Sequence, residues 1–512
     1  MEPHETLALR DPPRGYLQDM RIGIDVGTTR TIAAGADRGN YPVLSFQDPD
    51  GDPHGHFPSV IALDGDALVH GFEAERAARA GAPHLRSFKR LLGDPTTHPG
   101  TTVELGGREF ALLDLLTGYL TAVRTALPVP VGEVAVSVPA HAHSAQRVMT
   151  LEAFRRAGID VIAMINEPSA AGFEYTHHQS RSLTSRRTRI AVYDLGGGTF
   201  DSSLVEADGA SHVVLGSRGE NRLGGDDFDE VLAELALERA GIRPEDLSAA
   251  QHAALREECR EAKERLTPQT RRVMIEISAE HDPVILSVDD FYAAAAPLIE
   301  RTLEVMAPLV GALDADSGIA GIYLVGGGSG LPLVARLLRE RFGRRVHRSP
   351  YPAASTAIGL AIAVDPDADV TLTDRLSRGI GVFREADSGE GVAFDQVLTP
   401  EAPLPQTGST SVTRRYTAAH NLGWFRYVEH PALDDAGEPR GDLVPYADVL
   451  FPFDPALREL DAAELAAVTV ERREGGPEIE ETYTVDAAGI VTVRITDLSS
   501  GFSREYGLAR RG

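Results

Sequence analysis

The sequence has a single cysteine and no long apolar run. Cys259 cannot form a disulfide within the chain, which fits a reducing cytoplasm. It falls in a helical pattern, so we expect buried filler rather than a reactive thiol. No apolar run reaches the roughly 18 to 20 residues of a membrane-spanning helix, and residues 1–19 lack the apolar core of a secretory signal. We therefore expect a cytoplasmic protein that has no membrane partner and begins with a loose extension.

The sequence also has fewer basic residues than acidic residues. The 512 residues include 76 acidic residues against 50 lysine and arginine residues, which gives a formal net charge of -26. An acidic surface keeps a protein soluble and argues against nucleic acid as a partner. The composition, 42% hydrophobic and 25% charged, is that of a globular protein with a core large enough for two or three domains.

A glycine-rich turn organises the middle of the chain. The segment 189–201, RIAVYDLGGGTFD, reads as a strand ending on Asp194, a turn, and a second strand. Consecutive glycines let the backbone approach an anion closely, and a run of turn amides favours phosphate oxygens. Asp194 and Asp201 bracket the turn, and carboxylates beside a phosphate need a hard cation such as Mg²⁺ between them. On its own, the pattern also fits a plain glycine hairpin.

Two further glycine turns favour phosphate binding over the plain hairpin. The segment 21–31, RIGIDVGTTRT, repeats the pattern with an apolar strand, Asp25, Gly27 and two threonine hydroxyls. Two such hairpins suggest two similar lobes that clamp one polyphosphate. At 323–332, YLVGGGSGLP, a strand runs into a third turn and a helix, which would place backbone against a nucleotide's sugar or base. The combination resembles the actin-like ATPase superfamily of actin, sugar kinases and heat-shock chaperones.

The pattern of the chain changes near residue 365. Strands alternate with helices up to that point, which indicates an α/β domain, and short alternating segments with many turns follow, which predict a β-sandwich. The polar run 177–187 is expected to be a surface loop. We predict α/β architecture: an N-terminal extension 1–19, a two-lobed actin-like ATP-binding domain 20–364 (lobes 20–188 and 189–364), a linker 365–375 and a C-terminal β-sandwich domain 376–508.

The order of the motifs along the chain narrows the resemblance from the superfamily to one family. Over roughly residues 20 to 365 the chain resembles the DnaK-type, seventy-kilodalton heat-shock chaperone family, through IGIDVGTT, SFKRLLG, VAVSVPAHAHSAQR, INEPSAAG, IAVYDLGGGTFD, LGGDDFD and YLVGGGSGLP in family order. LTPEAPLPQTGSTSVTRRYTA and ETYTVDAAGIVTVRITDLSSG resemble strands of the family's substrate domain more faintly. Since the chain stops near there, the resemblance implies a member without the family's helical lid.

The resemblance implies roles for residues at the matching positions. Lys89 would reach the γ-phosphate and the attacking water, and Glu167 would hydrogen-bond near that water, because phosphoryl transfer depends on placed charge. Taken singly, Lys89 also fits an ordinary helix-surface residue, and Glu167 also fits a carboxylate at a helix N-terminus. The implied catalytic set is Lys89, Glu167, Asp194 and Thr199; the Mg²⁺ set is Asp25, Asp194 and Asp201; and the ATP/ADP set is Gly27, Thr28, Thr29, Gly196, Gly197, Gly198, Gly224, Gly225, Lys263, Thr267, Gly326, Gly327 and Gly328.

The sequence departs from the family at the adenine site. Gly330 stands where the family has an arginine that stacks on adenine, and Arg260 stands where it has a glutamate. Losing a stacking cation forfeits about 0.5 to 2 kcal/mol, so we predict weak or base-tolerant nucleotide binding. Arg30 beside the phosphates is a further departure. Ala163 replaces a basic residue that the family often uses for J-domain partners.

The leading hypothesis is an ATP-hydrolysing, chaperone-like protein whose β-domain binds unfolded or extended polypeptide under nucleotide control, with co-chaperones or a nucleotide exchange factor as further partners. A nucleotide-gated module for a dedicated folded partner is the alternative, and a small-molecule kinase of the superfamily is a third. The strands around SVTRRYTA and LGWFRYVE would form the peptide cleft. Trp424, Phe425 and Tyr427 fit either cleft lining or sandwich core, because neighbouring strand residues face opposite sides.

Overall fold

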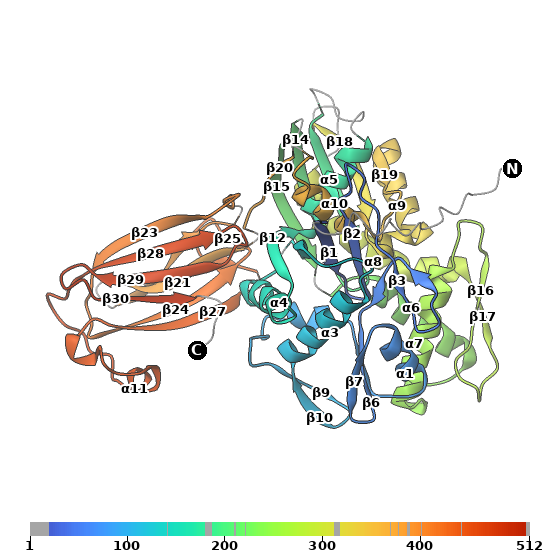
Figure 1. Cartoon of the computed structure of the whole chain (residues 1–512), viewed down its shortest axis with the longest axis horizontal. Coiled ribbons are helices and arrows are strands. Elements are labelled where there is room, and N and C mark those ends of the chain that lie inside the picture. The colour runs from blue at the N-terminus through green and yellow to red at the C-terminus, as the bar shows by residue number, and fades with distance from the viewer. Residues whose placement is uncertain are drawn as a thin grey trace.

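The computed structural model describes residues 20–140, 142–179, 187–208, 211–220, 222–311, 318–368, 370–376, 378–386, 390–400, 402–441 and 443–507. The predicted extension 1–19 and residues 180–186 of the predicted loop lie outside these ranges. The described part forms a two-lobed α/β domain with a β-sandwich beside it (Figure 1). The fold class predicted from the sequence is therefore confirmed.

The first lobe is built on a sheet in the order β12-β11-β1-β2-β5. β1 pairs in parallel with β11 and antiparallel with β2, and its Ile22 and Ile24 side chains are fully buried. The lobe contains β1 (Ile22–Val26), β2 (Arg30–Gly35), β3 (Phe46–Gln47), β4 (Pro53–His54), β5 (Phe57–Pro58), β6 (Val60–Asp64), β7 (Ala67–His70), α1 (Phe72–Arg79), β8 (His84–Arg86), α2 (Phe88–Leu92), β9 (Thr102–Leu105), β10 (Arg108–Ala111), α3 (Leu112–Ala126), β11 (Glu133–Val138), α4 (Ser144–Arg156), β12 (Asp160–Asn166) and α5 (Glu167–Gln179).

The second lobe repeats this arrangement around a sheet in the order β19-β18-β13-β14-β15-β20. β13 pairs antiparallel with β14 and in parallel with β18, as β1 does with β2 and β11. The lobe contains β13 (Arg189–Leu195), β14 (Phe200–Asp208), β15 (Ser211–Glu220), α6 (Gly225–Ala240), η2 (Pro244–Asp246), α7 (Ala249–Glu264), β16 (Arg272–Ile275), β17 (Val284–Ser287), α8 (Val288–Val310), β18 (Ile319–Val325), η3 (Gly327–Gly330), α9 (Pro332–Phe342), η4 (Gly343–Arg345), β19 (Val346–Arg348) and α10 (Ser355–Val364).

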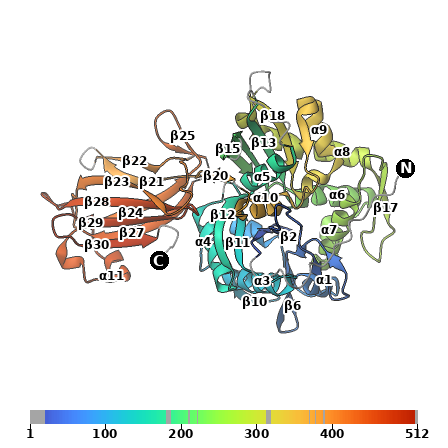
Figure 2. The same ribbon diagram turned by 45° about the horizontal axis from the view of Figure 1, so that its top comes forward.

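Two helices join the lobes. α10 covers β1 and β11, α5 covers β13 and β14, and the helices pack on each other between the sheets (Figure 2). The contact is close because its residues are small. A Cβ on Gly359 of α10 would overlap the Ala170 carbonyl oxygen of α5, and a Cβ on Gly23 of β1 would overlap that of Ala357. Glycine at these positions therefore sets the distance between the two lobes.

The segment predicted to be a linker contains a strand. β20 (Thr371–Thr373) pairs in parallel with β15 and forms one edge of the second sheet. Its sequence is short and polar, so local pattern alone did not indicate a strand; the free hydrogen-bonding groups of the sheet edge supply the partner. The connection to the β-sandwich is thus held against the second lobe.

The β-sandwich consists of two sheets in the orders β22-β21-β24-β27 and β23-β28-β29-β30. Its elements are β21 (Gly379–Ala386), β22 (Gly391–Leu398), β23 (Ser409–Thr417), β24 (Leu422–His430), β25 (Ala432–Leu433), β26 (Pro439–Arg440), β27 (Val444–Pro452), η6 (Pro455–Leu457), α11 (Ala462–Ala466), β28 (Glu478–Asp486), β29 (Val491–Asp497) and β30 (Ser503–Gly507). The sandwich meets the two-lobed domain at α4, where the Ser144 amide donates to Glu429 over 3.0 Å. Within the described ranges, no helix is both long and apolar enough to span a membrane.

Candidate functional site

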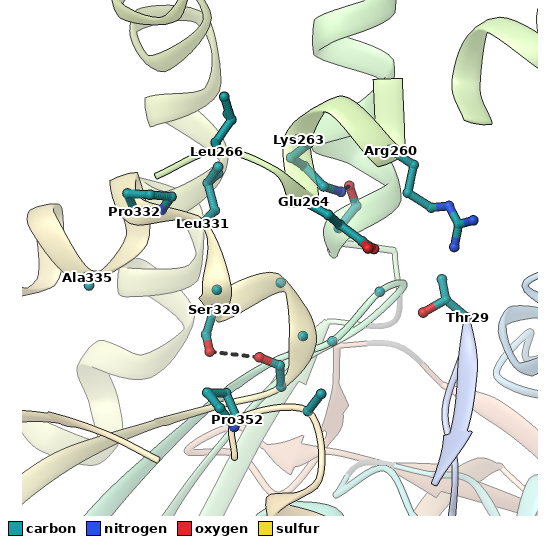
Figure 3. Close-up of a pocket in the computed structure, with 18 of the residues that line it drawn as sticks. Thr29, Arg260, Lys263, Glu264, Leu266, Ser329, Leu331, Pro332, Ala335 and Pro352 are labelled. Carbon is teal, nitrogen blue, oxygen red and sulfur yellow. Dashed lines mark hydrogen bonds between the residues drawn. The ribbon is translucent and has the colours of Figure 1, made fainter. Parts of the chain in front are cut away.

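A cavity of about 1080 Å³ lies between the lobes. The turn of the β1–β2 hairpin and the turn of the β13–β14 hairpin face it from opposite lobes, and η3 and α7 complete the wall (Figure 3). The turns are closed by backbone hydrogen bonds, from the Gly27 amide to the Arg30 carbonyl (3.0 Å) and from the Gly196 amide to the Thr199 carbonyl (2.9 Å). Such turns leave neighbouring amides available for an anion.

The two hairpins meet tip to tip. A Cβ on Gly197 would lie 2.7 Å from Cγ2 of Thr29, and one on Gly224 would lie 2.6 Å from the Gly198 backbone. No side chain larger than hydrogen fits these positions without displacing a neighbour. The glycines therefore allow the lobes to bring both turns to the same point, which is what binding one polyphosphate between them requires.

Lys89 enters the cavity from a short helix, α2, that is anchored in both lobes. Phe88 is buried in the core of the first lobe, and the neighbouring Arg90 donates to the Gly198 carbonyl (3.0 Å) and to Asp227 (2.8 Å) in the second lobe. These contacts fix α2 across the two lobes. The Lys89 side chain is consequently held over the hairpin tips rather than on a helix surface.

The Lys89 ammonium lies within a cluster of carboxylates. Its Nζ atom is 2.5 Å from Glu167 Oε1 and 4.0 Å from Asp25 Oδ1. Burial alone would lower the pKa of Lys89, but the two carboxylates raise it. Burial also raises the pKa of Glu167, to about 7, although the adjacent ammonium favours its ionised form.

Three aspartates, Asp25, Asp194 and Asp201, lie in or next to this cluster. Asp25 accepts a hydrogen bond from Ser137 (2.6 Å), and Asp201 accepts one from the Ala140 amide (2.9 Å). The pKa of Asp194 is raised by burial and by the nearby carboxylates of Glu167, Asp201 and Asp25. Such a concentration of acidic oxygens suits a hard cation like Mg²⁺. Among the described residues no group of three or more His, Cys, Asp or Glu side chains is placed to hold a metal ion directly.

Both lysines of the chain line the cavity. The sequence uses arginine for nearly all its basic positions and has lysine only at 89 and 263. Lysine carries a compact charge that arginine cannot replace. The Lys263 Nζ atom, however, is engaged by Asp229 and by the Gly225 carbonyl, each at 2.6 Å. Lys263 therefore braces α7 against the start of α6 at the cavity wall.

The outer end of the cavity is apolar on one side and charged on the other. Figure 3 shows Leu266, Leu331 and Pro332 together on one side, with Arg260 and Thr29 on another. Arg30 and Glu264 form an ion pair across the lobes. Arg260 pairs with Glu257 of its own helix. This end therefore offers a ligand an apolar wall together with charged side chains.

The structure brings the predicted site residues to one place. Gly198, Asp201 and Gly224 lie directly behind the lining, and the other residues predicted for catalysis, nucleotide binding and Mg²⁺ line the cavity. The sequence alone did not single out Arg90 or Asp229. Arg90 could have been noticed as the basic residue next to Lys89, and Asp229 as the last residue of the acidic segment LGGDDFD. The individual roles stay predictions.

A chain of hydrogen bonds leads from the cavity to the β-sandwich. Asp374, just after β20, accepts hydrogen bonds from the Asn166 amide (3.2 Å) and side chain (2.8 Å). Arg147 of α4 donates to Asn166 Oδ1 (2.6 Å) and to the Ala488 carbonyl in the sandwich (3.2 Å). Since Asn166 directly precedes Glu167, the cavity, the linker and the sandwich share one connected set of contacts.

The interior of the β-sandwich is filled at the place where aromatic residues could have lined the expected peptide cleft. Phe425 and Tyr427 are buried in the sandwich core, whereas Trp424 is 49% exposed on the outer face, with the Arg426 guanidinium 4.8 Å from its ring centroid. Between the sheets, the partly buried Arg384 also forms an ion pair with the buried Glu481 (2.6 Å). Of the two alternatives that the sequence left open, Phe425 and Tyr427 are sandwich core, because the strand turns both residues inward.

The fold and the paired hairpins define the class as actin-like, with a β-sandwich attached. Comparison with protein families agrees: the family model described as Hsp70 protein matches residues 21–381. The match covers both lobes and the linker and reaches into β21. The chain belongs to the Hsp70 family, which confirms the sequence resemblance, and members of this family are ATPases that act as ATP-dependent chaperones.

Proposed function

We propose that this chain hydrolyses ATP in the interlobe cavity. The observation that carries the proposal is the position of Lys89, 2.5 Å from Glu167 and held over the tips of both hairpins. The turn amides and threonine hydroxyls would hold the phosphates, as backbone nests do. Lys89 would neutralise charge on the γ-phosphate, and Glu167 would orient the attacking water. Bound Mg²⁺ would supply further charge neutralisation, held through water by Asp25, Asp194 and Asp201.

We further propose that the β-sandwich binds unfolded or extended polypeptide under nucleotide control, in the cytoplasm and with co-chaperones or an exchange factor as partners. The contacts through Asn166, Asp374 and Arg147 support the control. A nucleotide that interacts with Glu167 would alter the contacts of the residue next to Asn166. The linker strand and the sandwich would then respond through the same hydrogen bonds.

The second candidate is a nucleotide-gated module for a folded partner. It is favoured by the filled sandwich interior, where Phe425 and Tyr427 are core residues, and by the exposed Trp424 on the outer face. An exposed aromatic residue beside an arginine is typical of a surface that binds a preformed partner.

Peptide titration separates the two candidates. Labelled apolar peptides are added to the full chain without nucleotide and with ATP, and both peptide anisotropy and Trp424 emission are followed; Trp424 is the only tryptophan. We expect binding whose affinity changes with ATP. If no peptide binds at high micromolar concentration in either state, the polypeptide proposal fails and the folded-partner module remains.

A further inference from the structure

Topology brings Arg348 next to the third glycine turn. β18 and β19 run in parallel, with Leu324 opposite Arg348. The carboxyl ends of parallel strands share one edge of a sheet, and η3 (Gly327–Gly330) begins just after β18. Arg348 accordingly lines the outer end of the interlobe cavity. Its Nη2 atom lies 3.5 Å from the position that a Cβ would take on Gly330.

The guanidinium of Arg348 is available to a ligand. It is exposed, and within the part of the chain that the structure describes it has no ion pair or side-chain hydrogen bond. Arg336, which lines the same end, lies instead 5.2 Å from the ring centroid of Tyr292 and 4.0 Å from Glu340. Arg348 is thus a cation without an acidic partner at a cavity end whose wall includes Leu331 and Pro332.

We propose that Arg348 stacks on the base of the bound nucleotide, in the space that Gly330 leaves open. This inference rests on the proposed nucleotide site. A guanidinium is planar, weakly hydrated and stacks on aromatic faces, so it can cover a base whose other face meets apolar side chains. Every base offers such a face, so the contact strengthens binding without selecting adenine. Binding is then stronger than the glycine at 330 alone predicts, and it stays base-tolerant.

Calorimetric titration of the full chain with Mg²⁺ and three ligands tests this contact: ATP, GTP and inorganic tripolyphosphate. Arg348→Ala should weaken ATP and GTP alike, by about 2- to 30-fold, the range of one cation–π contact, and leave tripolyphosphate unchanged. Arg344→Ala is the matched control, because Arg344 is exposed on the adjacent η4 and does not line the cavity. It should change none of the three affinities.

A second variant tests whether the space beside Gly330 is where the guanidinium acts. Gly330 does not have a positive φ, and a Cβ there meets only Arg348 at ordinary contact distance, so we expect Gly330→Arg to be tolerated once Arg348 is removed. In the double variant Arg348→Ala/Gly330→Arg we expect ATP affinity to recover. The inference is overturned if Arg348→Ala binds ATP as the wild type does, or loses ATP and tripolyphosphate equally. A wild-type chain that binds none of the ligands overturns the proposed site itself.

Discussion

The Lys89 Nζ atom lies 2.5 Å from Glu167 Oε1, and both side chains are buried. The two residues come from different elements, α2 and the start of α5, so the contact is made by the fold and not by local sequence. A buried ion pair contributes little net stability, but each charge depends on the other for compensation. In the proposed ATP site, an arriving γ-phosphate would therefore replace one of these partners.

Removing one member of this pair should destabilise the chain without nucleotide. Glu167→Gln leaves the Lys89 ammonium buried with Asp25 at 4.0 Å as its nearest remaining carboxylate. We expect a loss of about 3 kcal/mol in the free energy of unfolding, the usual scale for an uncompensated buried charge. Denaturant titration with and without ATP measures it, and ATP should restore part of the loss. Equal stability of variant and wild type would show that the pair carries no such dependence.

Glu174 predicts a pH dependence of stability. Burial raises the pKa of its carboxyl to about 7, despite hydrogen bonds from Tyr323 and Ser349; the other nearby titratable group is His178, with Nε2 at 3.5 Å. The folded state therefore keeps a proton that the unfolded state releases near pH 4.5, so this stabilisation is lost as pH rises towards and through 7. The difference amounts to on the order of 3 kcal/mol.

Urea unfolding of wild type and Glu174→Gln between pH 5 and 8.5 checks this dependence. The amide stays neutral, so the stability of the wild type relative to the variant should fall as pH rises from about 5 to 7 and then level off. A constant difference across the range would mean that Glu174 titrates normally in the fold.

Adding one methyl group at the α5–α10 contact should destabilise the fold. A Cβ on Gly359 would overlap the Ala170 carbonyl oxygen, which is backbone and cannot move aside alone. Gly359→Ala should cost at least about 2 kcal/mol of unfolding free energy, as overpacking does. Gly55→Ala is the control, since a Cβ there meets only Val43 at 3.7 Å; it should stay within about 0.5 kcal/mol. Equal costs for the two variants would contradict the close packing.

Asp374 should hold the linker strand in place. Asp374→Ala removes both hydrogen bonds to Asn166, so β20 should separate from β15 more often. Hydrogen exchange of the amides at 371–373 is the measurement, and we expect it to be at least about tenfold faster in the variant. Asp367→Ala, an exposed acidic residue of the same segment, is the control and should leave exchange unchanged. Unaltered exchange in Asp374→Ala would show that strand pairing alone holds the linker.

The sequence predicted what depends on local pattern. The hairpin at Gly197 and the carboxylates that bracket it were foreseen, since a turn that approaches an anion needs particular residues. It did not predict which of Phe425 and Trp424 faces inward, because alternation fixes opposite faces and not their direction. The β20–β15 pairing and the approach of Arg348 to Gly330 join distant segments, so no local signal marks them.

The most direct test of the account is steady-state ATP turnover by the full chain with Mg²⁺. The wild type should hydrolyse ATP, and Lys89→Ala should keep nucleotide affinity while its turnover falls by a factor on the order of 10² or more, the scale of losing one positioned charge. Arg239→Ala, an exposed arginine on α6, should behave as wild type. Turnover in Lys89→Ala equal to that of the wild type, or no turnover by the wild type, would contradict the assignment of the interlobe cavity as an ATPase site.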